Sequence, residues 1–363
     1  MAKMDNKTRA ELILRPPTEE FIVESELHEK LASGEEIRHY VGYEVSGLVH
    51  LGTLLTAFKI ADLQKAGVKT LVFMADFHTI INKKLGGDTE LIRRVAREYF
   101  QKTMGLGIKI AGGDPGKTEF VLASEIYDQD YWATVVKAGI DTTLARSLRS
   151  LSIMGREEKQ GVPTAWVLYP LMQAADIFHQ RINLAHSGMD QRKIHVITRE
   201  IGEKIASYKP MCLHNHMLLG LHKPAVWPVP TDKEGKWAMF KMSKSLEGSA
   251  VFVNDSEDEI RKKIKSAFCP EGKEHNPILD WVKHIVFAPQ IKGELAVNRP
   301  EKYGGDTKYQ NYDSLEGDFL SGKLHPSDLK NSLSDFVVEL LAPFRKEFEG
   351  SKIVEELKSR ITR

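Results

Sequence analysis

One short segment, residues 69–78 (KTLVFMADFH), limits the folds that this chain can adopt. It is predicted to be a strand and is apolar at every position from 71 to 75, without the alternation of a strand that has one face in water. Strands buried on both faces occur in parallel sheets that are covered by helices. A predicted helix (53–67) precedes this strand, and Asp88 is placed to cap the next one. This order predicts an α/β fold with a doubly wound parallel sheet.

Three further segments are predicted to join the sheet as strands, namely 38–45, 117–124 and 181–187. Residues 125–165 are predicted to be mostly helical and to interrupt the alternation as an insertion. The helices expected after this insertion cover residues 165–180 and 189–206. Because ligands of doubly wound sheets bind at the carboxyl ends of the strands, we expect a site at residues 46–53 and 76–78.

The two ends of the chain are predicted to be helical. Residues 8–34 have a helical pattern, broken at Pro16 and Pro17. After about residue 253 we expect helices only, beginning with a helix that Asn254 or Ser256 caps. The predicted organisation is a helical extension, a Rossmann-like catalytic domain and a helical C-terminal domain, at residues 1–34, 35–252 and 253–363.

The composition excludes several classes of protein. The net charge is +1, so any nucleic-acid site must be a local patch and cannot depend on bulk charge. Two cysteines, Cys212 and Cys269, are too few for a disulfide scaffold and suit a reducing compartment. The first residues lack the apolar segment of a secretory signal, and no apolar run approaches the ~20 residues of a membrane span. We expect a cytoplasmic protein without a membrane segment.

The segment SGLVHLGT, residues 46–53, has the features of a phosphate-binding turn. Gly47 and Gly52 allow the backbone to approach a ligand, and the helix that follows directs free N–H groups at an anion. The ring of His50 and the hydroxyl of Thr53 can each donate a hydrogen bond to a phosphoryl oxygen. The same segment is also compatible with a glycine-rich turn that holds a structural histidine.

A second segment, FKMSKSLEGS (240–249), combines lysines, serines and a glycine. Its two lysines, Lys241 and Lys244, are mobile point charges that can follow the negative charge of a departing pyrophosphate. The alternative is a basic loop that is merely solvated. Occurring together with the His-x-Gly turn, however, Lys-Met-Ser-Lys-Ser is typical of class I aminoacyl-tRNA synthetases.

The chain resembles that class, and within it the tyrosyl-tRNA synthetases of the archaeal and eukaryotic branch. The resemblance extends from about residue 35 to residue 348. It is carried by the segments HYVGYEVSGLVHLGT, ADFHTIIN, YPLMQAADI, SGMDQRKIH, KMSKS, RPEKYGGD and KLHPSDLKN. The resemblance implies activation of L-tyrosine by ATP, with Mg²⁺ on the phosphates, and transfer to tRNA(Tyr). It also implies a homodimer that forms through the insertion.

The segment YPLMQAADI places Tyr169, Gln173 and Asp176 on one face of a helix. Three such polar side chains suit recognition of an amino acid, although a partly buried helix with incidental polar residues is the alternative. By the resemblance, the α-amino group of tyrosine binds to Tyr169, Gln173 and Gln191, and its phenol binds to Tyr40 and Asp176. Two residues at strand ends, Glu44 and His78, are expected as additional contacts.

The resemblance also implies an ATP site. Gly188 and Asp190 are expected at the ribose, and Met217 and Leu218 near the adenine. The residues expected at the phosphates are Gly47, His50, Gly52, Thr53, Lys241, Met242, Ser243, Lys244 and Ser245, of which His50, Thr53, Lys241 and Lys244 are the expected catalytic residues. Thr53 stands where the family usually has a second histidine, so we expect it to contribute less than His50.

Two regions are expected to contact tRNA. By the resemblance, Arg149, Arg192 and Lys193 face the first base pair of the acceptor stem, although a solvated basic face would have the same composition. His325 and Asp328 match residues that read the first anticodon base, and Phe287 is the candidate for stacking on a base. Without the resemblance, KLHPSDLKN (323–331) is an ordinary turn into a helix with Pro326 in its first turn.

Some alternatives remain open at this point. The cysteine and histidines of CLHNHMLLGLH, which are Cys212, His214, His216 and His222, fit no tetrahedral zinc spacing, so we expect no metal site. A tryptophanyl-tRNA synthetase is disfavoured by Asp176 with Tyr40, because indole offers a single N–H donor. A small-molecule adenylyltransferase would not need the helical region after residue 253. A non-catalytic tRNA-binding relative would not need the intact KMSKS segment.

Overall fold

The computed structural model describes residues 4–154, 161–224, 242 and 248–361. Contacts between Cα atoms divide the chain into two compact units. The first unit comprises Met1–Gly47 and Lys59–His216, and the second comprises Leu48–Phe58 and Met217–Arg363. Among the described residues, none of the helices has both the length and the apolar character needed to cross a membrane.

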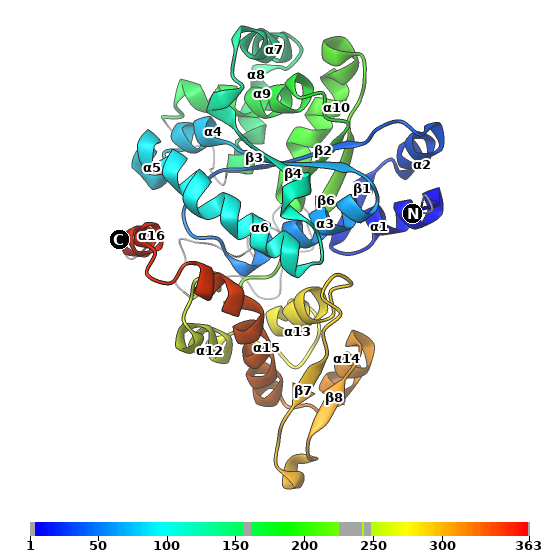
Figure 1. The fold of residues 1–363 in the computed structure, drawn as a ribbon, viewed down its shortest axis with the longest axis vertical. Helices are drawn as coiled ribbons and strands as arrows, with labels where there is room; N and C mark the ends of the chain where they lie inside the picture. The colour runs from blue at the N-terminus through cyan, green and yellow to red at the C-terminus, as the bar shows by residue number, and fades with distance from the viewer. Residues whose placement is uncertain (1–3, 155–160, 225–241, 243–247, 362–363) are drawn as a thin grey trace. The chain divides into compact units, whose positions relative to one another are not determined.

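A six-stranded sheet lies at the centre of the first unit (Figure 1). Its strands are β1 (Thr18–Ile22), β2 (Arg38–Tyr43), β3 (Lys69–Met74), β4 (Thr118–Leu122), β5 (Leu184–Gly188) and β6 (Met211–Asn215). Their order is β1-β6-β5-β2-β3-β4, and every neighbouring pair is parallel except β1 with β6. The predicted doubly wound parallel sheet is therefore confirmed, with its switch point between β2 and β5.

Helices connect these strands. Those of the first unit are α1 (Asn6–Leu14), α2 (Glu24–Ser33), α3 (Leu54–Lys65, which begins in the second unit), α4 (Asp76–Ile81), α5 (Thr89–Arg94), α6 (Gln101–Ile110), α7 (Gln129–Ile140), α8 (Leu144–Arg149), α9 (Thr164–His179) and α10 (Arg192–Ala206). Asp88 caps α5 through the N–H of Leu91, as predicted. Helix α9 packs against α7 and α10, and the side chains of these three helices form one apolar core.

The N-terminal residues differ from the prediction of helix on both sides of the two prolines. After α1 and the Pro16–Pro17 pair, the chain forms strand β1 and pairs antiparallel with β6. Proline ends α1, and the five residues TEEFI are too few to show the alternation that reveals a strand. The end of α1 is anchored by the buried ammonium of Lys59, which donates hydrogen bonds of 2.7–3.0 Å to the carbonyl oxygens of Leu12, Ile13 and Arg15.

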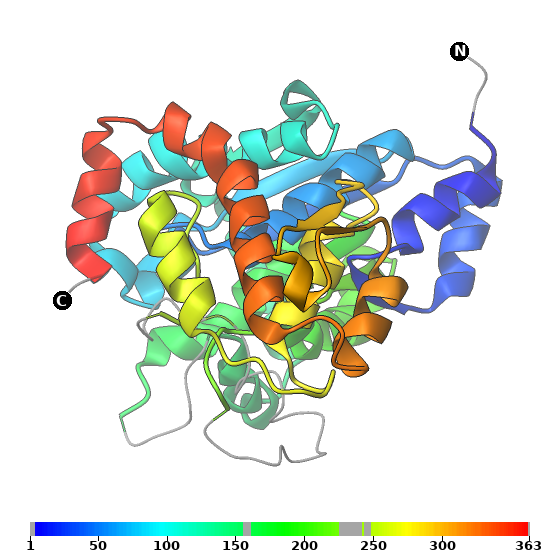
Figure 2. The ribbon, with the colours of Figure 1, turned by 90° about the horizontal axis from the view of Figure 1, so that it is seen from below.

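The second unit is mostly helical. Its elements after α3 are α12 (Glu257–Ser266), α13 (Pro277–Trp281), β7 (Leu295–Val297), β8 (Thr307–Tyr309), α14 (Tyr312–Leu320), α15 (Pro326–Glu347) and α16 (Lys352–Ile361). Helix α12 packs along α15, as Figure 2 shows. Of the two predicted caps, Ser256 is the one that caps α12, in a capping box with Glu259.

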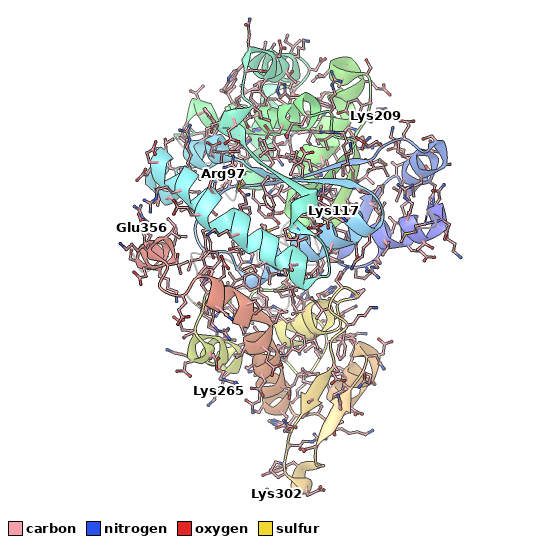
Figure 3. All side chains as sticks on the ribbon, in the orientation of Figure 1. Arg97, Lys117, Lys209, Lys265, Lys302 and Glu356 are labelled. Atoms are coloured by element: carbon pink, nitrogen blue, oxygen red, sulfur yellow. The ribbon has the colours of Figure 1, made fainter. Side chains whose placement is uncertain are left out.

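A two-stranded antiparallel sheet, β7 with β8, interrupts the helices of this unit. The prediction of helices only after residue 253 is wrong at this hairpin, because strands of three residues carry no periodic pattern. The connecting loop turns through Gly304 and Gly305, whose φ angles of 104° and 67° favour glycine. Figure 3 shows Lys302 at the outer end of this loop.

Candidate active site

The carboxyl ends of three strands bring the predicted polar residues to one edge of the sheet. Strands β3 and β5 flank β2 and run parallel to it, so all three end on the same side. Glu44 follows β2, His78 lies in α4 just after β3, and Gln191 lies just after β5. Helix α9 adds Tyr169, Gln173 and Asp176.

Asp176 is the most enclosed acid of this group, with no exposed surface. Its Oδ1 accepts a hydrogen bond of 2.8 Å from the hydroxyl of Tyr127, and its Oδ2 lies 3.7 Å from His78 Nε2. Burial raises the pKa of Asp176 to about 8, although the neighbouring hydroxyls of Tyr127, Tyr131 and Tyr40 act in the opposite direction. Burial also lowers the pKa of His78 to about 4, so its ring is neutral at pH 7.

Tyr40 reaches this carboxylate from β2, across a glycine. A Cβ atom added to Gly42 would lie 2.2 Å from the Tyr40 hydroxyl oxygen, so any side chain at position 42 would displace the phenol. Burial, together with the charge of Asp176, raises the pKa of Tyr40 well above its usual value. The Tyr40 hydroxyl therefore stays protonated and can donate.

A second carboxylate, Glu44, lies at the other side of Tyr169. Its Oε1 accepts hydrogen bonds from the Tyr169 hydroxyl at 2.7 Å and from Asn82 Nδ2 at 2.8 Å. The ring of His78 meets Tyr169 edge-on, with ring centroids 4.5 Å apart. Gln173 Nε2 lies 3.4 Å from Gln191 Oε1. The structure thus links the predicted tyrosine-binding residues into three sets, one around Asp176, one around Glu44 and the pair Gln173–Gln191.

Three residues of this arrangement were not predicted from the sequence: Gly42, Asn82 and Tyr127. Asn82 and Gly42 lie inside the segments ADFHTIIN and HYVGYEVSGLVHLGT, so their position in those segments was the available signal. Tyr127 gave no such signal, because it lies in the helical insertion, 49 residues away from the Asp176 that it contacts.

In the second unit, the His-x-Gly turn pairs with the chain that follows the KMSKS segment. Leu51 N donates to Val251 O at 2.8 Å, Val253 N donates to Val49 O at 2.9 Å, and His50 forms an antiparallel bridge with Phe252. A Cβ added to Gly52 would lie 3.1 Å from His50 Nδ1 and 3.6 Å from Met242 Sδ. A side chain at position 52 would therefore crowd the His50 ring and only touch Met242.

Other predicted ATP residues are placed as follows. Gly47 has a φ of 117°, a conformation that favours glycine. Thr53 is buried and its N–H bonds to the His50 carbonyl. Gly188 ends β5, Asp190 lies in the turn Met189–Gln191, Leu218 is buried and Met217 is half-buried. Lys241, Ser243, Lys244 and Ser245 lie outside the described residues.

The three basic residues predicted at the acceptor stem are exposed. Arg149 ends α8, while Arg192 and Lys193 begin α10. Arg192 Nε donates to both carboxylate oxygens of Glu20, at 2.9 and 2.8 Å. Strand β1 therefore contributes a side chain to this edge of the sheet.

The predicted anticodon contacts lie at the start of α15. His325 is exposed and is the N-cap of this helix, its Nδ1 accepting from Ser327 N at 3.1 Å, and Pro326 lies in the first turn as predicted. Asp328 is half-buried, with Oδ2 4.0 Å from Arg299 Nη1. Arg299 also donates to Lys323 O at 2.8 Å, which ties RPEKYGGD to KLHPSDLKN. Phe287 follows the π-helical segment Val282–Val286 and is half-buried.

Three of the zinc candidates, Cys212, His214 and His216, lie on or just after β6. His214 contacts Glu20 at 2.8 Å and His195 at 3.0 Å, whereas His216 contacts Glu19 at 3.0 Å. Cys212 is buried, and burial raises the pKa of its thiol to about 12. The side chains of this strand therefore have structural partners.

Known proteins share this sequence and fold. The family described as tRNA synthetases class I (W and Y) matches residues 32–342. A tyrosine–tRNA ligase of Thermococcus sibiricus is 49% identical over 360 residues, which cover 95% of this chain and 96% of that ligase. The crystal structure of tyrosyl-tRNA synthetase complexed with L-tyrosine from Pyrococcus horikoshii has a TM-score of 0.93 at 46% identity, covering 98% of this chain and 100% of that one.

A tyrosyl-tRNA synthetase from Aeropyrum pernix has a TM-score of 0.83 at 36% identity and covers 99% of each chain. Each of these matches covers nearly the full length of this chain and of the compared protein, so the similarity concerns the whole chain and not one domain of it. The chain belongs to the class I tRNA synthetases, and within them to the tyrosyl-tRNA synthetases of the archaeal and eukaryotic branch.

Proposed function

We propose that this chain activates L-tyrosine with ATP and transfers the tyrosyl group to tRNA(Tyr). The observation that carries this proposal is the buried carboxylate of Asp176, faced by Tyr40 and Tyr127. Within the described residues its Oδ2 accepts no hydrogen bond. A buried acceptor without a donor is costly, and the phenol of tyrosine supplies that donor whereas phenylalanine does not.

The first step joins two substrates without a general base. The tyrosine carboxylate attacks the α-phosphorus of ATP in line, a new O–P bond forms, and the bond to the β-phosphate breaks to release pyrophosphate. A carboxylate is already ionised at pH 7, so the protein contributes positioning and stabilisation of charge. We assign His50 and Thr53 to the α-phosphate, Lys241 and Lys244 to the pyrophosphate, and Mg²⁺ to the incoming nucleotide as its metal complex.

The second step uses RNA. A terminal ribose hydroxyl of tRNA(Tyr) attacks the adenylate carbonyl, the ester forms and AMP leaves. We assign Arg149, Arg192 and Lys193 to the acceptor stem, since all three are exposed. We assign His325, Asp328 and Phe287 to the anticodon, with residues 35–252 as the catalytic domain and 253–363 as the anticodon-binding domain.

We also propose that the chain forms a homodimer through the insertion at residues 125–165. Trp132, Val136 and Ile140 are 39%, 62% and 77% exposed and recur at every fourth position of α7, so they form one apolar stripe. Leu144, 62% exposed, begins the next helix. Large apolar side chains that gather on one exposed face are typical of contact surfaces. Free cysteines suit the reducing cytoplasm, where we place the enzyme.

Amino-acid-dependent exchange of pyrophosphate into ATP tests the proposed activity. We expect exchange with tyrosine and none with tryptophan or phenylalanine at the same concentration, with phenylalanine reacting only at a far higher concentration. Exchange with tryptophan alone would indicate a tryptophanyl-tRNA synthetase. No exchange with any amino acid would indicate a non-catalytic tRNA-binding relative.

A further inference from the structure

Tyr127 lies in the turn before α7 and is held rigidly. Its ring stacks on Tyr131, with centroids 3.7 Å apart and planes at 10°, and its other neighbours include Phe77 at 5.2 Å. From this position its hydroxyl donates to Asp176 Oδ1 at 2.8 Å and lies 3.4 Å from His78 Nδ1. The stack therefore fixes where the hydroxyl points.

The two carboxyl oxygens of Asp176 differ in their hydrogen bonding. Oδ1 is engaged by Tyr127, whereas Oδ2 accepts no hydrogen bond within the part of the chain that the structure describes. The neighbouring His78 is neutral at pH 7, because burial lowers its pKa to about 4, and so supplies no counter-charge. A carboxylate that is anchored by one oxygen presents the other in a fixed direction.

We propose that Tyr127 is a positioning residue for amino-acid selection: its hydroxyl anchors Asp176 so that Oδ2 meets the phenol of bound tyrosine. This inference rests on the proposed function, since it assigns how the tyrosine site distinguishes tyrosine from phenylalanine. Tyr127 acts through Asp176 and not by direct contact with the reacting atoms. The alternative is a purely structural role, in which the ring of Tyr127 packs against Tyr131 and Phe77 and its hydroxyl does not affect selectivity.

The substitution Tyr127→Phe separates these two roles, because it keeps the stacked ring and removes only the hydroxyl. Removing a hydrogen bond so that a buried polar partner is left unsatisfied costs a factor of roughly ten to a hundred. We expect kcat/KM for tyrosine in pyrophosphate exchange to fall by about that factor, through KM and not through kcat. With phenylalanine kcat/KM should not fall, so the selectivity ratio decreases by the same factor.

Tyr208→Phe is the matched control. The Tyr208 hydroxyl donates a hydrogen bond of 2.9 Å to Ile182 O, just before the amino end of β5. The variant loses this bond as Tyr127→Phe loses its own, but the acceptor is Ile182 and not Asp176. We expect no change in selectivity from this variant. A double-mutant cycle of Tyr127→Phe with Asp176→Asn should be strongly non-additive, because the first residue acts through the second.

The pH profile gives an independent readout. The groups that face Asp176 are Tyr40 from β2, His78 from α4, Tyr131 from α7 and Tyr169 from α9 itself. The Tyr127 bond favours the ionised form of Asp176, so its loss raises the pKa of that carboxyl further. The rising acidic limb of kcat/KM for tyrosine should therefore move to higher pH in Tyr127→Phe.

Unchanged selectivity, or an equal fall in kcat with both amino acids, would overturn the inference while leaving the proposed function intact. Absence of tyrosine-dependent exchange in the unmodified protein would reject both. If Tyr127→Phe does not fold, replacing Tyr127 with 4-aminophenylalanine or with 4-methylphenylalanine forms a second test, because both keep the ring and the reach of tyrosine and only the first has an N–H donor. Selectivity should be higher with the amino group, and equal selectivity would overturn the inference.

Discussion

Tyr169 donates its hydroxyl hydrogen to Glu44 Oε1 at 2.7 Å, and Asn82 donates to the same oxygen at 2.8 Å. Glu44 follows β2, Asn82 follows α4 and Tyr169 belongs to α9, so three elements converge on one carboxylate. A carboxylate held in this way is a fixed negative charge beside the residues expected at the α-amino group.

Glu44→Gln should therefore raise KM for tyrosine roughly tenfold, because the substitution removes the charge while keeping a hydrogen-bonding side chain. Initial rates of pyrophosphate exchange at varied tyrosine and at varied ATP would measure this. KM for ATP should stay unchanged, and a larger effect on ATP than on tyrosine would place Glu44 in a different part of the site.

The phosphate turn leads to a ranking of its two polar residues. Thr53 can donate one hydrogen bond but cannot carry charge, whereas His50 can do both. We expect His50→Ala to slow adenylate formation by about a hundredfold and Thr53→Ala by less than about tenfold. Single-turnover formation of tyrosyl-adenylate measures both rates. Equal losses would show that the ranking is wrong.

Acid should destabilise the first unit through buried histidine pairs. His39 Nε2 and His186 Nδ1 are 2.9 Å apart across β2 and β5, and burial lowers the pKa of His39 to about 3. The unfolded chain binds a proton near pH 6.5 and the folded chain does not, so stability is lost as the pH falls below 6.5.

The expected loss is about 1.4 kcal/mol per pH unit for each such histidine. Urea unfolding at pH 7, 6 and 5 would show it. In His39→Gln, unfolding should take up about one proton fewer, so the free energy of unfolding should depend less steeply on pH. His28→Gln, at an exposed position of α2, should leave this slope unchanged.

The apolar stripe on α7 predicts the oligomeric state. Val136→Glu together with Ile140→Glu should convert a dimer into monomers, because burying two unpaired carboxylates in an apolar contact is costly. Sedimentation velocity would resolve the two species, with Lys137→Glu as a control that alters charge on the same helix outside the stripe. A dimer that survives the double substitution would require a different contact surface.

The sequence predicted the parts of the fold that depend on local patterns. Strand β3, the capped helix α5 and the turn at Gly47 and Gly52 follow from apolar runs, cap residues and glycines. Two elements that were predicted as helix, β1 and the β7–β8 hairpin, are short strands whose stability comes from their partners and not from their own sequence.

The same distinction holds for the site. Tyr169, Gln173 and Asp176 were predicted because they share one helix face. The contact of Tyr127 with Asp176 joins the insertion to that helix, and no local pattern predicts a contact between such distant positions. The room that Gly42 leaves for Tyr40 is likewise a tertiary requirement, visible only once the phenol is placed.

Strand β1 has a consequence for the handling of the protein. It covers the outer edge of β6, all of whose residues are buried, whereas the opposite edge strand, β4, carries an exposed Glu119 and follows the exposed Lys117. Charged side chains discourage an edge from pairing with other chains, and β6 has no such protection of its own. A protein that lacks its first 22 residues would therefore expose the unpaired edge of β6. We expect it to aggregate even though its catalytic residues are intact.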